Sequence, residues 1–246
     1  MKPKVTIVIA SYNSGKTIKR ALQSVEDQTF QDWECLVVDG ASKDDTIKIV
    51  KEFVDSDSRF RIISEPDDGI YDAFNKGWRN SKGEWIYYLG SDDWLEVDGL
   101  EKLLTEEDCD SAILSGDIIY RRLDGTEKLH QSDMPALGSH QGMVTRRTII
   151  EIMGGFNEKY KIHADHELII RILNAGYKMK LVHVVVAHFI IGGTSQNLKT
   201  IFISSREKYE IYKSFDALKY PRITAILSSL KKLLSLMMRG VRSKTN

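Results

Sequence analysis

The chain has 246 residues, with 35 Lys and Arg, 35 Asp and Glu, and a formal net charge of zero. That length can bury a core as one large domain or as one domain with an appendage. Two cysteines, Cys35 and Cys109, exclude a disulfide framework and a zinc cluster, and they fit a reducing cytosol. No uncharged apolar segment approaches the roughly 20 residues of a transmembrane helix.

The zero net charge hides an uneven distribution. Residues 201–246 contain ten Lys and Arg against three Asp and Glu, a net charge of +7, which leaves −7 for the preceding residues. An acidic body argues against general nucleic-acid binding, so no nucleic-acid partner is expected. The basic end is a candidate for contact with an anionic surface such as a lipid headgroup layer.

The first half of the chain alternates predicted strands and helices. Residues 5–10 form an apolar run that is too short for a signal-peptide core and predicts the first strand. Helical spacing follows at residues 16–28, around Val50 and around Phe74, and the intervening predicted strands are 35–38, 60–64 and 85–89. This order predicts a parallel, right-handed, doubly wound sheet that is covered by helices.

The second half predicts a smaller, mixed or antiparallel part and a helical tail. Its expected elements are short strands at 111–115, 118–122 and 142–145, a hairpin at 124–125, a helix after 163–165, strands at 178–182 and 184–189, and helices over 199–215 and from Pro221 onward. We expect a catalytic domain over 1–198, divided into halves 1–95 and 96–198, and a basic helical appendage over 199–246.

The tail has the pattern of an amphipathic helix. Its apolar stripe is Ile223, Ile226, Leu227, Leu230, Leu233, Leu234 and Met237, opposite Ser228, Lys232, Ser235, Arg239 and Arg242. Such a helix could lie in a membrane interface, pack on the domain, or pair with a second copy of the chain as a homodimer.

A pair of carboxylates, Asp92 and Asp93, follows the apolar run 85–89. At the carboxyl end of a strand, such a pair would lie at the sheet edge where open α/β folds bind ligands. Adjacent carboxylates repel unless a cation joins them, and Mg²⁺ commonly bridges carboxylates and substrate phosphates. The alternative is a solvated turn.

Other polar residues are predicted at the same sheet edge. Ser11 and Tyr12 end the first strand and Asp39 ends the second, where a carboxylate can hold a ribose or a base; the alternative for Asp39 is a helix cap. Asp68 begins the next helix, and Lys76 could offer a cation to a phosphate. An acidic residue there could instead simply complement the helix dipole.

The ordered motifs resemble family 2 of the inverting glycosyltransferases. They are residues 6–13 (TIVIASYN), 28–30 (QTF), 37–46 (VVDGASKDDT), 68–77 (DGIYDAFNKG) and 83–93 (GEWIYYLGSDD). The resemblance covers residues 4 to about 95 and continues more weakly to about 198. It implies the GT-A fold, a nucleotide-sugar donor, and Mg²⁺ or Mn²⁺ as the metal.

The resemblance also implies roles for single residues. Ser11, Tyr12 and Asp39 match the base and ribose positions, and Asp68 falls in the donor-binding segment. Asp93 matches the metal ligand of a DxD-type motif and Asp92 a ribose or sugar contact, although Ser91 replaces the first acid. His188 lies where some GT-A enzymes supply a histidine to the metal; the alternative is a structural histidine.

The acceptor side is predicted from the second half. Asp165 precedes Leu168, Ile169 and Ile172 on one helical face, so it should point inward. The resemblance makes Asp165 the general base, although the family's preceding acid is here Ala164; the alternative is a helix cap. His140 and Gln141 resemble the loop that lines the acceptor side, and Trp94 could stack on a sugar or simply pack.

The hypothesis from sequence is an inverting transfer of a sugar from a nucleotide-diphosphate sugar, with a UDP-sugar favoured, to a glycan or lipid-linked acceptor. The family's settings imply a cytoplasmic enzyme of polysaccharide synthesis, peripheral at the inner face of the membrane. The alternatives are an inactive nucleotide-sugar-binding regulatory protein and a nucleotidyltransferase. The latter needs a Gly-rich basic loop that residues 11–16 match poorly.

Overall fold

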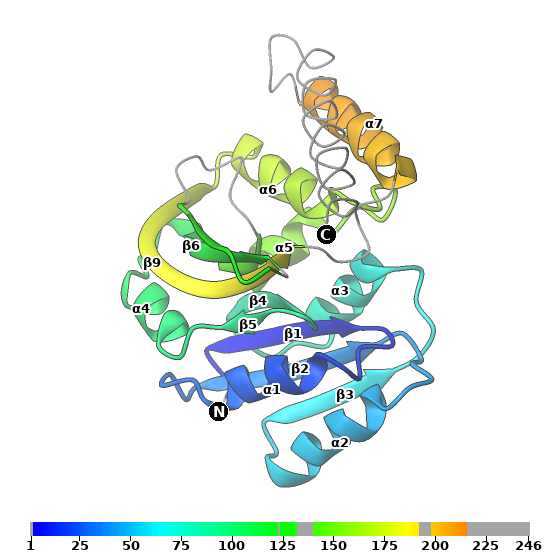
Figure 1. Cartoon of the computed structure of the whole chain (residues 1–246). Helices are drawn as coiled ribbons and strands as arrows, with labels where there is room; N and C mark the ends of the chain where they lie inside the picture. Colours follow the sequence, from blue (N-terminus) through cyan, green and yellow to red (C-terminus); the bar gives the residue numbers. More distant parts are fainter. Residues whose placement is uncertain (1, 123, 132–139, 192–197, 216–246) are drawn as a thin grey trace.

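A computed structural model describes residues 2–122, 124–131, 140–191 and 198–215 as one curled sheet with helices on both faces (Figure 1). The strands are β1 (Val5–Ser11), β2 (Trp33–Asp39), β3 (Phe60–Ser64), β4 (Trp85–Gly90), β5 (Trp94–Leu95), β6 (Ser111–Arg122), β7 (Glu127–His130), β8 (Met143–Arg146) and β9 (Lys178–Ile191). The helices are α1 (Ile18–Glu26), α2 (Thr46–Ser56), α3 (Ile70–Arg79), α4 (Gly99–Thr105), α5 (Arg147–Met153), α6 (Ala164–Asn174) and α7 (Leu198–Ser214), with a 3₁₀ turn, η2 (His140–Gly142).

The strand order is β3-β2-β1-β4-β8-β6-β9-β5, and β7 pairs with β6. Strands β3, β2, β1 and β4 are parallel, whereas β8 is antiparallel to both β4 and β6. The chain builds β2 and β3 on one side of β1 and then places β4 on the other side. The order therefore reverses between β1 and β4, and such a switch point is where open α/β sheets bind their ligands.

Two apolar cores cover the two faces of the sheet, because alternate side chains of a strand point to opposite faces. Ile7 and Ile9 face the core under α1, α2 and α4, whereas Val8 faces the core under α3, α5 and α6. Helix α7 packs beyond α6 (Figure 1) and adds Ile211 and Tyr212 to the second core. The described part of the predicted appendage is thus packed into the same unit.

The predicted strands and helices of the first half are confirmed. In the second half, α4 and α5 were not predicted, and two pairs of predicted strands are each one strand. Residues 111–115 and 118–122 form the single strand β6, and 178–182 and 184–189 form the single strand β9. These two strands pair in parallel, with register shifts around Asp117. Gly116 lies there because a Cβ would come within 2.4 Å of the Val186 side chain. The interruptions in sequence are β-bulges, which look like turns in a one-dimensional pattern.

The hairpin at residues 124–125 is confirmed by the pairing of β6 with β7. The predicted helix from Pro221 onward lies outside the described residues. No helix among the described residues is both long and apolar enough to cross a membrane.

The close approach of α3 to β1 depends on Gly77. A Cβ at this position would lie 2.3 Å from Val8 Cγ1. We expect Gly77→Ala to lower the free energy of unfolding by about 1–3 kcal/mol through overpacking. Urea titration of Gly77→Ala, Val8→Ala and the double variant measures it. The double variant should recover part of the loss, and strictly additive effects would contradict the contact.

Candidate active site

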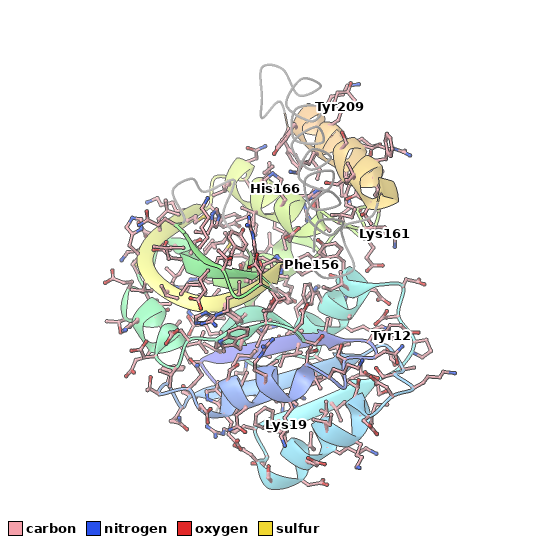
Figure 2. The ribbon with its side chains drawn as sticks, in the orientation of Figure 1. Tyr12, Lys19, Phe156, Lys161, His166 and Tyr209 are labelled. Atoms are coloured by element: carbon pink, nitrogen blue, oxygen red, sulfur yellow. The ribbon has the colours of Figure 1, made fainter. Side chains whose placement is uncertain are left out.

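A cleft of about 760 Å³ opens at the switch point between β1 and β4. It is lined by the segments that follow these two strands, by one residue after β2, and by the segment that leads into α3: Ala10, Ser11, Tyr12, Asn13, Ser14, Lys16, Thr17, Asp44, Asp67, Gly69, Ile70, Ala73, Gly90, Ser91 and Asp92. Tyr12 is 64% exposed at the outer edge of the sheet (Figure 2), as a side chain that can cover a ligand would be. The structure thus brings the predicted Ser11, Tyr12 and Asp92 together.

Asp39 lies fully buried directly beneath this cleft. Its Oδ1 accepts hydrogen bonds from Ser11 Oγ at 3.0 Å and Ser42 Oγ at 2.5 Å, and its Oδ2 accepts from Ser42 N and Ser64 Oγ, each at 2.9 Å. Four donors fill the lone pairs of a carboxylate. A ribose or base that contacted Asp39 would have to displace one of these hydroxyls.

Two predicted donor residues lie apart from the cleft lining. The Asp68 side chain is exposed, and its neighbour Asp67 lines the cleft instead. Lys76 Nζ donates to Pro66 O at 2.7 Å and pairs with Glu65 and Asp72 at 3.1 and 3.3 Å. Lys76 therefore stabilises the turn before α3. Asp72 precedes Lys76 by one helical turn, so the two side chains lie on the same face of the helix and can pair.

Asp92 and Asp93 form a small acidic pocket over Gly90. A Cβ at Gly90 would lie 2.5 Å from Asp93 Oδ2 and 3.1 Å from Asp92 Oδ1, so the missing side chain leaves both oxygens facing one space. Asp93 is 1% exposed, and Ile190 N donates to its Oδ1 at 3.0 Å. Burial raises the pKa of Asp93 to about 7, and the charge of Asp92 adds to the rise.

This pocket fits a cation that also binds substrate. The described residues contain no group of three or more His, Cys, Asp or Glu side chains that could hold a metal ion. Mg²⁺ sites for nucleotides typically use one or two carboxylates, and the substrate phosphates supply further oxygens. A cation there would also relieve the repulsion that raises the pKa of Asp93.

Asp165 lies in the first turn of α6 and makes two short side-chain contacts. Its Oδ2 lies 2.6 Å from His140 Nδ1, and its Oδ1 accepts a hydrogen bond from Tyr71 Oη at 2.9 Å. Tyr71 Oη also lies 2.8 Å from Ile162 O, so it shares its proton between two acceptors. The predicted base and the predicted acceptor-side histidine are thus hydrogen-bonded to each other.

The contacts of Asp165 favour its ionised form. Burial alone would raise the pKa of Asp165, but the charge and hydrogen bond of His140 outweigh it and hold that pKa well below its usual range. Burial and the Asp165 charge raise the pKa of Tyr71 well above its usual range. Tyr71 therefore stays a donor and Asp165 stays ionised.

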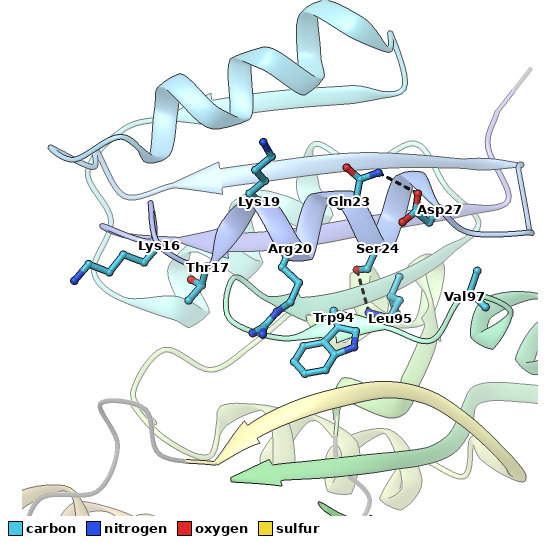
Figure 3. Close-up of a pocket in the computed structure, with 10 residues that line it drawn as sticks. All are labelled: Lys16, Thr17, Lys19, Arg20, Gln23, Ser24, Asp27, Trp94, Leu95 and Val97. Carbon is cyan, nitrogen blue, oxygen red and sulfur yellow. Dashed lines mark hydrogen bonds between the residues drawn. The ribbon is translucent and has the colours of Figure 1, made fainter. Parts of the chain in front are cut away.

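Trp94 lines a separate groove of about 720 Å³ along α1 (Figure 3), and the buried His188 packs against it. Their rings stack with centroids 4.9 Å apart, and the Arg20 guanidinium lies 4.0 Å over Trp94. His188 Nε2 lies 2.7 Å from Glu96, and Arg121 donates to its Nδ1 at 3.3 Å. Both ring nitrogens of His188 are engaged by protein side chains, which argues against a role of His188 as a metal ligand.

Arg20 is a functional candidate that sequence reasoning missed. Its guanidinium donates to Asp92 O at 2.6 Å, which ties α1 to the loop that carries the two aspartates. Figure 3 shows Arg20 reaching across from α1 toward Trp94. The helical period places Arg20 on the solvent-exposed side of α1, so the sequence alone gives no sign of a role. The contact with Asp92, which is distant in sequence, indicates one.

Glu207 of α7 is a second missed residue. Its carboxylate accepts from the backbone N–H groups of Lys161 at 2.6 Å and of Ile162 and His163 at 3.0 Å, directly before α6. Figure 2 places Lys161 beside this junction. Glu207 thus provides an acceptor from another helix for three backbone amides before α6, which fixes the segment that leads into Asp165.

Comparisons with known proteins identify the family. The sequence profile of Glycosyl transferase family 2 matches residues 6–181, so the chain belongs to that family of glycosyltransferases. A PGL/p-HBAD biosynthesis glycosyltransferase of Mycobacterium bovis is 32% identical over 206 residues, which are 80% of each protein.

Two solved structures share the GT-A fold of this chain. Staphylococcus aureus TarS 1–349 in complex with UDP-GlcNAc has a TM-score of 0.70 at 18% identity, covering 94% of this chain and 73% of that one. Mannosyltransferase PcManGT from Pyrobaculum calidifontis, in complex with GDP-Man and Mn²⁺, has a TM-score of 0.67 at 16% identity, covering 97% and 76%.

The role of Glu207 predicts a specific loss. Glu207→Ala leaves buried amides without an acceptor, and we expect a loss of about 1–3 kcal/mol in the free energy of unfolding. Glu210→Ala is the matched control on the same helix, because Glu210 pairs with Lys159 and Arg206 near the surface. Thermal denaturation compares the two, and equal losses would contradict the role of Glu207.

The raised pKa of Asp93 predicts a pH-dependent stability difference. Between the unfolded value of about 4 and the folded value of about 7, only the unfolded chain ionises, so this carboxyl destabilises the fold increasingly as pH rises. Asp93→Asn should therefore be more stable than wild type at pH 8, by up to about 4 kcal/mol, and equally stable near pH 4. Chemical denaturation of both proteins in EDTA, at pH values from 4 to 8, measures this difference in stability. A stability difference that does not change with pH would contradict the prediction.

Proposed function

We propose that this glycosyltransferase moves a sugar from a nucleotide-diphosphate sugar to an acceptor hydroxyl, with inversion at the anomeric carbon. The observation that carries the proposal is an acidic pair at the edge of the cleft together with a separate buried carboxylate that is connected to α3. Asp92 and Asp93 lie at the end of β4, and Asp165 is linked through Tyr71 to the helix that begins in the cleft lining. A single displacement needs one group that stabilises the leaving diphosphate and a separate group that acts as base, and these carboxylates supply the two.

The donor half of the proposal assigns the cleft to the nucleotide. Tyr12 covers the base, Ser11 and Asp39 hold the ribose, and Asp92 contacts the ribose or sugar. Asp67 replaces Asp68 as the carboxylate facing this space, and Lys76 is omitted because it is engaged with Glu65 and Asp72. A UDP-sugar is favoured, and the solved complex of TarS with UDP-GlcNAc supports it.

The proposal includes Mg²⁺ or Mn²⁺ held by Asp93, with Asp92 beside it. The cation would stabilise the negative charge that develops on the departing diphosphate. The space over Gly90 and the buried charge of Asp93 support this assignment. The Mn²⁺ in the complex of the archaeal mannosyltransferase supports it independently.

The acceptor is proposed to be a glycan or lipid-linked hydroxyl that approaches from the side of His140 and Gln141. Base catalysis at this hydroxyl depends on the Asp165 carboxylate. Contact of the basic tail with a membrane surface, and a homodimer, stay predictions because residues 216–246 lie outside the described part.

The base function predicts a split between binding and chemistry. Asp165→Asn should reduce kcat by at least 10²-fold while donor binding stays intact, because Asp165 contacts no part of the donor cleft lining. Calorimetric titration of UDP-, GDP- and dTDP-sugars measures binding, and transfer to alkyl glycosides measures kcat. Retained turnover would overturn the assignment of Asp165.

The proposed metal site predicts a change in donor binding. Asp93→Ala should lose the gain in donor affinity that Mn²⁺ gives the wild-type protein, because the shared cation links the enzyme to the diphosphate. The control is Asp98→Ala, whose carboxylate pairs with Lys102 on the surface. Calorimetry with and without Mn²⁺ is the measurement, and equal Mn²⁺ dependence in Asp93→Ala and wild type would refute the site.

A further inference from the structure

The first turn of α3 contacts both the cleft and the Asp165 carboxylate. Ile70 and Ala73 line the cleft. Tyr71, which lies between them in sequence, donates a hydrogen bond from its Oη to Asp165 Oδ1 at 2.9 Å. Successive residues of a helix differ in direction by about 100°, so one turn can present side chains to two different places. A single helical turn therefore connects the position of Asp165 to the wall of the cleft.

We propose that Tyr71 is the positioning residue of the base, and that its hydroxyl holds the Asp165 carboxylate in the orientation that takes the proton of the acceptor hydroxyl. This inference rests on the proposed function, since it adds a residue to the base of the same sugar transfer. The role of Tyr71 is indirect, because it acts on the reaction only through Asp165.

The contacts of the Asp165 carboxylate orient it and still leave it able to take a proton. Tyr71 Oη lies at Oδ1, and His140 Nδ1 lies 2.6 Å from Oδ2. One contact on each oxygen restricts rotation of the carboxylate, so the directions of its lone pairs are fixed. An ionised carboxylate has about four lone-pair sites, and these two contacts do not exhaust them.

The hydroxyl of Tyr71 is itself held in place. Ile162 O lies 2.8 Å from Tyr71 Oη, and Ile162 N donates to the Glu207 carboxylate at 3.0 Å, which fixes that segment of backbone. Of the two acceptors of the Tyr71 proton, an ionised carboxylate makes the stronger, charge-assisted hydrogen bond. The Tyr71 ring stacks on Phe156 with centroids 5.5 Å apart, and the residue is 7% exposed. A packed ring and a fixed second acceptor keep the hydroxyl beside the carboxylate.

Asn75, one helical turn after Tyr71, ties the same helix to the segment before α6. Its side chain is buried, its Nδ2 donates to Phe156 O at 2.9 Å, and its Oδ1 accepts from Phe156 N at 2.9 Å. Asn75 Nδ2 also donates to Glu158 Oε1 at 2.6 Å. Helix α3 and the segment that leads into α6 are thus joined at Asn75 as well as at Tyr71, which preorganises the contact with Asp165.

Tyr71→Phe tests this role, because it removes the hydroxyl and keeps the ring. We expect kcat for transfer to alkyl glycosides to fall by about 10–100-fold, the range that corresponds to loss of a hydrogen bond to a charged group. The donor Kd, measured by calorimetry, should stay within about twofold of wild type, because the hydroxyl is directed at Asp165. An unchanged kcat would contradict the proposal, and so would a loss confined to donor binding.

Tyr88→Phe is the matched control. The Tyr88 ring packs against Phe74 and Phe156 of the same aromatic cluster, with centroids 4.6 and 5.0 Å away. Its buried hydroxyl has no hydrogen-bond partner among the residues that the structure describes. Removing a hydroxyl of this kind should change kcat by less than about twofold. Equal losses of kcat in Tyr88→Phe and Tyr71→Phe would show a general effect of packing and would contradict the proposal.

A double-variant cycle provides a readout that a merely structural role would not change. When Asp165 is already replaced by Asn, Tyr71→Phe should lower the residual kcat, measured with a radiolabelled donor, by less than about threefold. The reason is that the orientation of an absent base no longer matters. The same fold-loss in both backgrounds would show that Tyr71 acts independently of Asp165 and would contradict the proposal.

Failure of the proposed function gives a different result. In that case wild type would transfer no sugar from any UDP-, GDP- or dTDP-sugar, or Asp165→Asn would retain full turnover. The inference about Tyr71 alone fails when Asp165→Asn loses turnover and Tyr71→Phe keeps the kcat of wild type.

Discussion

The pairing of β1 with β2 on one side and β4 on the other is the constraint on which the rest of the structure depends. Both pairings are parallel and start from Val5, so the two neighbours deliver their carboxyl ends to the same edge. Asp39 reaches this edge at the end of β2, and Asp93 lies just beyond the end of β4. The cleft lies at this edge, lined mainly by the segments that follow β1 and β4 and by the start of α3.

The site places acidic groups in three different environments. Asp39 is buried among four donors, Asp93 is buried with one backbone donor and a neighbouring charge, and Asp165 is paired with an imidazole. Burial raises the pKa of Asp93 to about 7, whereas His140 holds that of Asp165 well below its usual range. Opposite pKa shifts in two carboxyl groups are typical of groups that have different roles in catalysis.

Local patterns predicted the strands of the first half because alternating and helical periods are properties of neighbouring residues. They also predicted Ser11, Tyr12 and Asp92 at the cleft, since these residues directly follow strands. Sequence patterns did not predict irregular turns or contacts between residues that are far apart in the chain. They could not choose between Asp67 and Asp68, which differ by one residue in an irregular turn, nor show that Lys76 pairs with Glu65. The bond between His140 and Asp165 joins residues 25 positions apart and has no signature in sequence.

The central claim is a single displacement at the anomeric carbon, and the configuration of the product tests it most directly. Proton NMR of the first product formed from an α-linked sugar nucleotide reports the coupling constant of the new anomeric proton before mutarotation or hydrolysis. The account predicts a β-linked product, because the acceptor attacks on the face opposite the diphosphate. An α-linked product would contradict it.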